Sequence, residues 1–188
     1  MLSPTQIKQL ESYRDKSYVS SILFQKHSDL YSLLKNIIHF QLIATTSIMG
    51  IINSNYEPDK LKTMNIVLNC TTALILGILN NFKFEFKAHT FNKLSLKMNR
   101  LCHSIENDLS DNLDNLTQEN INKYINEYDN INESLEFGLI QMLKTKIKKK
   151  YKNKKVLPNS LNCEGSFLEE NIDGELLFIN NNNNNINV

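Results

Sequence analysis

Side chains able to perform catalysis or to hold a metal are few in this sequence. The four histidines are isolated, and His89 and His103 lie two heptads apart on one predicted helix, too far to share a metal ion. The chain has no glycine-rich phosphate loop, no nucleophile elbow, no HExxH pattern and no paired cysteine cluster. We therefore expect no catalytic site, no metal site, no cofactor and no small-molecule substrate, and a protein that is not an enzyme.

Polar and small residues gather instead inside two uncharged runs of the chain. His39 and Gln41 lie in the first run, while Asn65 and Asn69, four residues apart on one helical face, lie in the second. Such side chains are costly inside a membrane span, so they are candidates for a pore lining or for hydrogen bonds between helices. His39 has an alternative place near the cytosolic interface. Small residues four apart, which let helices approach closely in lipid, complete the candidate site: Thr46, Gly50, Ala73 and Gly77.

A lysine-rich segment near the C-terminal end is a second candidate site. Residues 144–155 contain eight lysines and no acidic residue. Near a bilayer each lysine contributes about 1 kcal/mol of attraction to anionic headgroups. Nucleic-acid phosphates are an alternative partner, less expected because the whole chain has a net charge of only +1, and plain solvation of a charged helix end is another. The headgroup candidates are Lys144, Lys146, Lys148, Lys149, Lys150, Lys152, Lys154 and Lys155.

The two uncharged runs have the length of membrane spans. Asn36 to Tyr56 and Thr63 to Phe82 each contain about 20 residues, enough to cross a hydrocarbon core about 30 Å thick. The connector contains Pro58 and adjacent charges, which suit a tight solvated turn. We predict an antiparallel two-helix transmembrane hairpin. Because long apolar runs also occur in buried helices, a soluble helical bundle is the alternative.

Residues beside the spans predict the orientation of the hairpin. Lysine and arginine are frequent outside the two spans, whereas only Lys60 and Lys62 lie in the connector. Tyr31 and Phe82 flank the spans at the level that headgroups would occupy. The predicted location is a membrane, crossed twice, with both termini in the cytosol.

Amphipathic patterns predict further helices on both sides of the spans. A helix begins at Ser3-Pro4 and runs towards Leu34 in this prediction. The apolar stripe after the second span continues to Leu109 without proline or glycine, which predicts one helix of about 48 residues, half span and half cytosolic. A last helix, capped by Thr117, is expected to continue through Ile147.

These elements define an all-α chain with one domain and a tail. Residues 1–158 are predicted to form a two-span helical domain, in which the second span continues into a long cytosolic helix that packs with N- and C-terminal amphipathic helices. From residue 159 to 188 the composition becomes acidic and then asparagine-rich, and we expect a flexible tail there.

Nine single residues accompany this order of parts: Ser17, His27, Tyr31, Ala88, His89, Tyr128, Asp129, Leu157 and Pro158. With these residues and this order of helices, the chain resembles over residues 10–162 the SLATT family, the SMODS- and SLOG-associating two-TM effector domains. The resemblance is strongest to members carried by large nucleocytoplasmic DNA viruses. One departure is Phe137-Gly138-Leu139, where related sequences tend to have a proline. The resemblance implies a membrane effector that oligomerises and forms pores or perturbs membranes when nucleotide-sensing partners activate it.

The leading functional hypothesis is a non-enzymatic integral membrane protein that self-associates into a homo-oligomer and forms a pore, with membrane lipid as its other partner. A structural membrane scaffold that recruits partners or anionic lipid is the first alternative. A soluble helical bundle that binds nucleic acid through the lysine run is the second.

Overall fold

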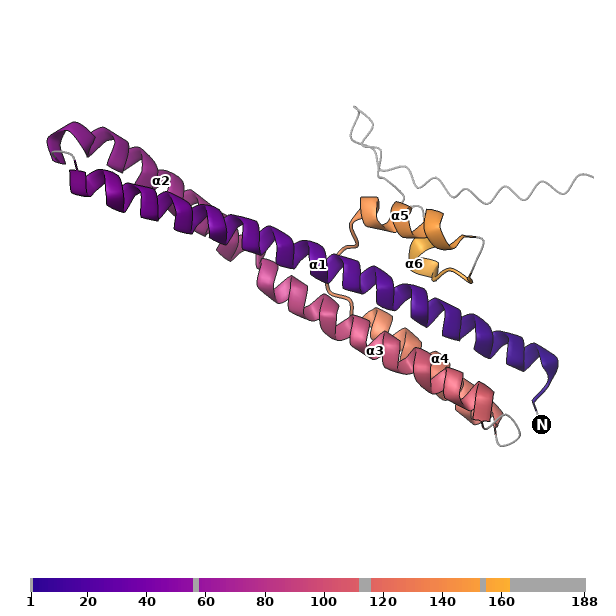
Figure 1. Cartoon of the computed structure of the whole chain (residues 1–188). Coiled ribbons are helices and arrows are strands. Elements are labelled where there is room, and N and C mark those ends of the chain that lie inside the picture. The colour runs from indigo at the N-terminus through magenta and orange to yellow at the C-terminus, as the bar shows by residue number, and fades with distance from the viewer. Residues whose placement is uncertain (1, 56–57, 112–115, 153–154, 163–188) are drawn as a thin grey trace, which may run out of the picture.

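The computed structural model describes residues 2–55, 58–111, 116–152 and 155–162, and over these ranges all regular structure is helical. The molecule is elongated, because its long helices run along one another (Figure 1). The all-α prediction is confirmed. In chain order the helices are α1 (Pro4–Asn55), α2 (Pro58–Phe82), α3 (Phe84–Asp111), α4 (Gln118–Glu133), α5 (Gln141–Tyr151) and α6 (Asn159–Asn162).

Helix α1 contains both the predicted N-terminal helix and the first span. Its 52 residues extend about 78 Å. The start is a reciprocal cap, in which the Ser3 N–H donates to Gln6 Oε1 at 2.6 Å and the Gln6 N–H donates to Ser3 Oγ at 3.3 Å. No proline or glycine occurs between Pro4 and Gly50, so nothing in the sequence interrupts the helix. One rigid element therefore joins the predicted cytosolic and membrane parts.

The second half of the predicted hairpin is α2, which returns alongside the C-terminal half of α1, as predicted (Figure 1). Helix α2 already begins at Pro58, a residue that the first turn of a helix tolerates. Lys62, predicted to lie in the connector, is therefore helical. Tyr56 lies outside the described residues.

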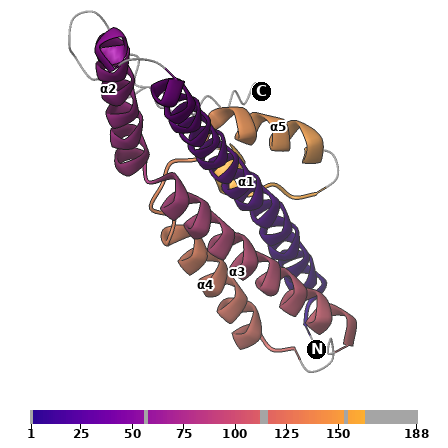
Figure 2. The ribbon, with the colours of Figure 1, turned by 60° about the vertical axis from the view of Figure 1, so that its left-hand side comes forward.

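A single residue divides the predicted 48-residue helix into α2 and α3. Lys83 has a φ of 48°, in the left-handed region that side-chain-bearing residues rarely adopt. Hydrogen bonds continue on both sides, from the Lys83 N–H to the Leu79 carbonyl at 3.3 Å and from the Lys87 N–H to the Lys83 carbonyl at 3.0 Å. The second span does continue into a long helix, but through a sharp change of direction (Figure 2).

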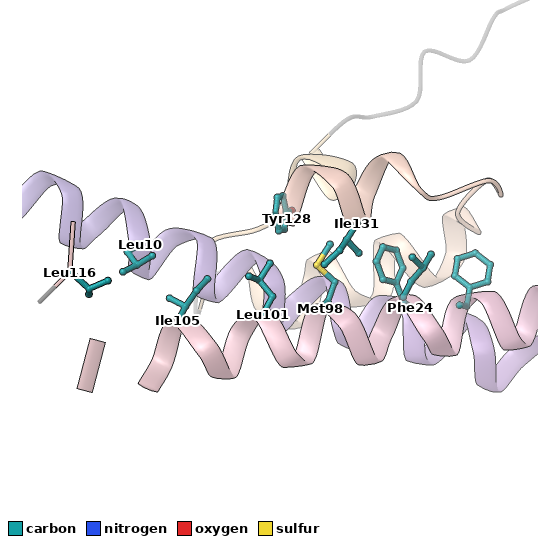
Figure 3. Packing of buried hydrophobic residues seen from close by; sticks show 10 residues of the cluster. Leu10, Phe24, Met98, Leu101, Ile105, Leu116, Tyr128 and Ile131 are labelled. Atoms are coloured by element: carbon teal, nitrogen blue, oxygen red, sulfur yellow. The ribbon is translucent and has the colours of Figure 1, made fainter. Parts of the chain in front are cut away.

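The core lies where α3 and α4 pack against the N-terminal half of α1 (Figure 3). The α3 stripe is buried there from Phe91 to Ile105, as its three-and-four spacing predicts, while Phe84 and Leu109 at its ends are partly buried. Thr117 caps α4, accepting from the Asn120 N–H at 3.4 Å, and Leu116 and Ile121 are both buried as a staple. The buried residues of this cluster are Leu10, Phe24, Phe91, Leu94, Met98, Leu101, Ile105, Leu116, Tyr128 and Ile131.

Serines allow α1 and α3 to approach closely. Ser95 Oγ donates to the Ser21 carbonyl at 2.9 Å, and Ser28 Oγ donates to the Ala88 carbonyl at 2.9 Å. Both donors are buried, and Ser17 on α1 is fully buried as well. Small side chains that bond to the backbone of the neighbouring helix thus hold these two helices together along the part outside the predicted spans.

The last predicted helix is two helices. Helix α4 ends at Glu133, and after a linker α5 lies on the side of α1 opposite α4 (Figure 1). The exposed Gly138 disfavours a continued helix, and Phe137 packs edge-on against Phe86 at 5.9 Å, which holds the linker against α3.

The structured part of the chain also extends beyond the predicted boundary at residue 158. Residues 159–162 form α6, and Leu161 is 2% exposed in a second cluster with Val19, Leu23, Ile147 and Tyr151. The apolar contact of Leu161 explains why these residues join the domain. The rest of the predicted tail, 163–188, lies outside the described residues.

Candidate functional site

Two helices are long and apolar enough to cross a membrane: α1, and the helical stretch that begins in α2. None of the residues in the apolar window of either helix is buried. Large apolar side chains point outward along both, with exposed fractions up to 74% at Phe40 and 70% at Leu74. The other strongly exposed members include Ile37, Ile43, Ile48, Ile51, Ile66 and Val67.

A polar groove separates the two spans. It encloses about 420 Å³, and threonine and asparagine side chains provide most of its polar lining. Asn65 Nδ2 donates to Asn53 Oδ1 at 3.1 Å, a hydrogen bond that joins α2 to α1 across the groove. The lining residues are Thr45, Thr46, Met49, Gly50 and Asn53 of α1, with Asn65, Leu68, Asn69 and Thr72 of α2.

Four of the eight predicted span residues therefore meet in one place: Thr46, Gly50, Asn65 and Asn69. Sequence analysis did not single out Asn53, although it is the hydrogen-bond partner of Asn65. Its position twelve residues before Asn65, across a turn, was the signal that could have identified it.

The predicted small residues are not covered by other atoms of the described chain. A Cβ atom added at Gly50 or at Gly77 would meet no atom within 4 Å. Ala73 is exposed, and the Thr46 hydroxyl donates to the Leu42 carbonyl of its own helix at 3.0 Å. The described hairpin leaves open space at both glycines, whereas the serine contacts described above join α1 to α3.

His39 and Gln41 lie outside the groove. Both are exposed on α1, and neither belongs to the groove lining. Lys35 pairs with Glu85 at 3.0 Å just before the first span, and His39 is one helical turn beyond that ion pair. This position fits the alternative placement of His39 near the interface.

Helix α5 positions most of the predicted lysine site. Ile147 and Tyr151 are buried against α1, which leaves Lys146, Lys149 and Lys150 exposed on the opposite face. Lys144 and Lys148 are half-buried, Lys152 is exposed, and Lys154 lies outside the described residues.

Lys155 makes a different contact from the other lysines. Its Nζ lies 3.0 Å from Asp15 Oδ1, and Arg14 Nη2 lies 3.1 Å from the same oxygen. Burial acts to raise the pKa of Asp15, but the hydrogen bonds from Lys155 and Arg14 outweigh it and hold that pKa below its ordinary value. The ion pair of Lys155 with Asp15 therefore links the chain after α5 to α1.

His27 is a buried polar contact whose role sequence analysis did not predict. The ring is fully buried and stacks on Phe91, with centroids 4.9 Å apart. Nδ1 lies 2.8 Å from the Leu23 carbonyl, and Nε2 accepts a hydrogen bond from the Ile140 N–H at 2.8 Å. These contacts assign the proton to Nδ1. Burial lowers the pKa of His27, although the Leu23 carbonyl acts in the other direction.

Among the described residues, no group of three or more His, Cys, Asp or Glu side chains is placed to hold a metal ion. No protein-family model, curated protein or solved structure matches the chain. Function is therefore inferred from the hairpin and the surfaces described above.

Proposed function

We propose that the protein is a non-enzymatic integral membrane protein that self-associates through its hairpin and forms a pore. The observation that supports this most is the polar groove on a hairpin that exposes large apolar side chains outside the groove. In this proposal the membrane is crossed twice and both termini lie in the cytosol.

Energetics favour a membrane around the hairpin. Fully burying one large apolar side chain is worth about 1.5–3 kcal/mol. Eight such side chains more than half exposed would forfeit on the order of 10 kcal/mol in a soluble monomer, comparable with the whole stability of a domain. A lipid environment removes that cost, which is why we prefer it to the soluble nucleic-acid-binding bundle.

The polar groove also favours association with a second copy of the hairpin. Amides and hydroxyls facing hydrocarbon without partners are costly, and helices in membranes commonly satisfy such groups by association. Asn69 lines the groove, and Gly50 beside it leaves room for a close neighbour. Several hairpins with these faces turned inward would enclose a polar path.

A single set of experiments tests the proposal. The protein should resist extraction by alkaline carbonate, migrate as an oligomer in mild detergent and release dye from liposomes. Asn69→Leu should reduce release, whereas Asn81→Leu, the same chemical change at an exposed position near the end of α2, should not. Monomers with intact liposomes would refute the pore, and complete carbonate extraction would refute the membrane placement.

The resemblance to SLATT effectors supports the same proposal. The order of parts, two spans followed by a long helix and a basic C-terminal helix, agrees with the helices described above. Activation by a nucleotide-sensing partner would then come from another protein.

A membrane scaffold is a second candidate, favoured by the length of the part outside the spans. From Pro4 to Lys35, α1 extends about 48 Å beyond the hairpin and carries α3, α4 and α5. If this is the function, liposomes stay intact while charge reversal at Lys149 and Lys150 abolishes binding to anionic vesicles.

A further inference from the structure

The exposed lysine face of α5 has no acidic partner among the described residues. None of the ion pairs in the described part of the chain involves Lys146, Lys149 or Lys150, and the Lys150 ammonium lies 5.2 Å from the centroid of the Tyr151 ring on its own helix. Met142 lies on the same side of α5, one turn before Lys146, and is 67% exposed. This face, defined by Met142, Lys146, Lys149 and Lys150, combines positive charge with an apolar end.

The orientation of α5 separates this face from the predicted bilayer. The first turn of α5 lies at His27, because Ile140 bonds to that ring, and its last turn lies at Tyr18, whose ring meets Tyr151 at 6.2 Å. Helix α5 therefore runs away from the spans. His27 precedes the first span residue by nine positions, or about 14 Å of helix, and Tyr18 precedes it by 18 positions, or about 27 Å. Both lengths exceed the screening distance of about 8 Å at physiological salt, and the separation is largest at the end of α5 that carries Lys149 and Lys150.

The same chain provides a complementary sequence immediately after α6. Residues 163–188 contain five acidic residues and no lysine or arginine. Apolar residues alternate with the acids, so the segment matches both the charge and the apolar end of the α5 face. The acids are Glu164, Glu169, Glu170, Asp173 and Glu175, and the apolar residues among and after them include Phe167, Leu168, Ile172, Leu176 and Phe178.

Chain geometry places this sequence within reach. Leu161 is buried against Ile147 and Tyr151, so the chain leaves the described fold beside α5. The seven residues from Asn162 to Glu169 can span up to about 24 Å, whereas α5 is about 16 Å long.

We propose that the acidic segment 164–175 docks on the α5 face of its own chain and neutralises its lysines. This contact does not depend on whether the hairpin forms a pore.

Carbodiimide cross-linking of the full-length protein in neutral-lipid nanodiscs tests the contact. We expect bonds between the five acids and Lys146, Lys149 or Lys150, found within one chain when isotopically light and heavy chains are mixed. The exposed lysines Lys97 and Lys123 are matched controls on α3 and α4 and should stay unlinked to the segment. Absent bonds, bonds spread evenly over the controls, or bonds between light and heavy chains would overturn the proposal.

Two further measurements separate the acidic segment from lipid. Replacing all five acids by their amides should raise acetylation of Lys149 about twofold to fivefold, as loss of an exposed ion pair implies, with Lys123 unchanged. Equal acetylation before and after replacement would contradict docking. Nanodiscs that contain phosphatidylserine should leave the cross-links intact, and loss of the cross-links there would assign the α5 face to headgroups instead.

Discussion

The Nε2 atom of His27 accepts a hydrogen bond from the backbone N–H of Ile140 at 2.8 Å, across 113 residues of sequence. Ile140 is the N-cap residue of α5, and it has no side-chain cap of its own. His27 thus connects the helix that enters the predicted membrane to the start of the basic helix. The bond requires a neutral imidazole, because a protonated Nε2 is a donor and would face another donor.

Lowering the pH should therefore destabilise the fold through His27. The folded-state pKa of His27 lies below its unfolded value of about 6.5, so the unfolded chain binds more protons as pH falls below that value. Stability is complete above pH 6.5 and decreases as pH falls through the folded pKa, by at most about 1.4 kcal/mol per pH unit. Thermal unfolding between pH 7.5 and 5 measures this loss.

Variants identify the group responsible for the pH effect. His27→Gln keeps an acceptor but cannot titrate, so its unfolding midpoint should change less over this pH range. His103→Gln, at an exposed histidine 3.6 Å from Glu106, should keep the pH dependence of the parent protein. A steep dependence that persists in His27→Gln would assign the effect to another group. The charged residues next to His27 on α1, Lys26 and Asp29, form an ion pair with each other at 3.5 Å and not with the His27 ring.

Asp15→Asn should loosen the attachment of the C-terminal segment. The substitution removes the charge that Lys155 and Arg14 share, and we expect a loss of about 1 kcal/mol in the free energy of unfolding. Asp29→Asn breaks the pair with Lys26, in which both side chains are about half exposed. This substitution should lower the free energy of unfolding by less than about 0.5 kcal/mol. Chemical denaturation compares the two, and equal losses would contradict a structural role for Asp15.

The serine contact between α1 and α3 predicts strong sensitivity to side-chain size. Ser21 is buried on α1 and its carbonyl accepts a hydrogen bond from Ser95 of α3, so Ser21→Leu should destabilise the fold by about 1–3 kcal/mol through overpacking. Ser32→Leu, at an exposed position of the same helix, should change stability little. If denaturation midpoints of the two variants coincide, the close approach of α1 and α3 is not maintained in solution.

Periodicity predicted most of the helices and the buried α3 stripe, because these depend on local spacing along one helix, and the lengths of two uncharged runs predicted the hairpin. The prediction of a single last helix was wrong, because it is divided into α4 and α5. Periodicity could not locate the break at Lys83, since no glycine or proline marks that residue. It also missed the contact of His27 with Ile140, which depends on how the linker after α4 crosses to the other side of α1. The groove was partly predicted, since Asn65 and Asn69 share a face, whereas the contact of Asn53 with Asn65 depends on how α1 and α2 lie against each other.

Glycine substitutions at Lys83 and at Lys93 should change the free energy of unfolding in opposite directions. Lys83→Gly should stabilise the joint between α2 and α3 by about 1 kcal/mol, because glycine adopts a positive φ without the steric cost of a side chain. Lys93→Gly, in the interior of α3, should instead destabilise by about 1 kcal/mol. Unfolding free energies measured in the same detergent give the comparison. A loss of stability in both variants would mean that Lys83 is helical in solution.

Orientation in the membrane gives the last prediction. Asn132 is followed by Glu133 and Ser134, an acceptor sequence for N-glycosylation, and it lies at the end of α4 outside the hairpin. With both termini in the cytosol, Asn132 should stay unmodified when the chain is translated with microsomes, as should an acceptor tag fused after Val188. A flexible insertion carrying an acceptor sequence between residues 56 and 57 should be glycosylated, because the proposed topology places the connector on the opposite side. A glycan on Asn132 together with an unmodified connector would reverse the orientation, and it would bring the lysine face of α5 to the side that lacks most anionic lipid.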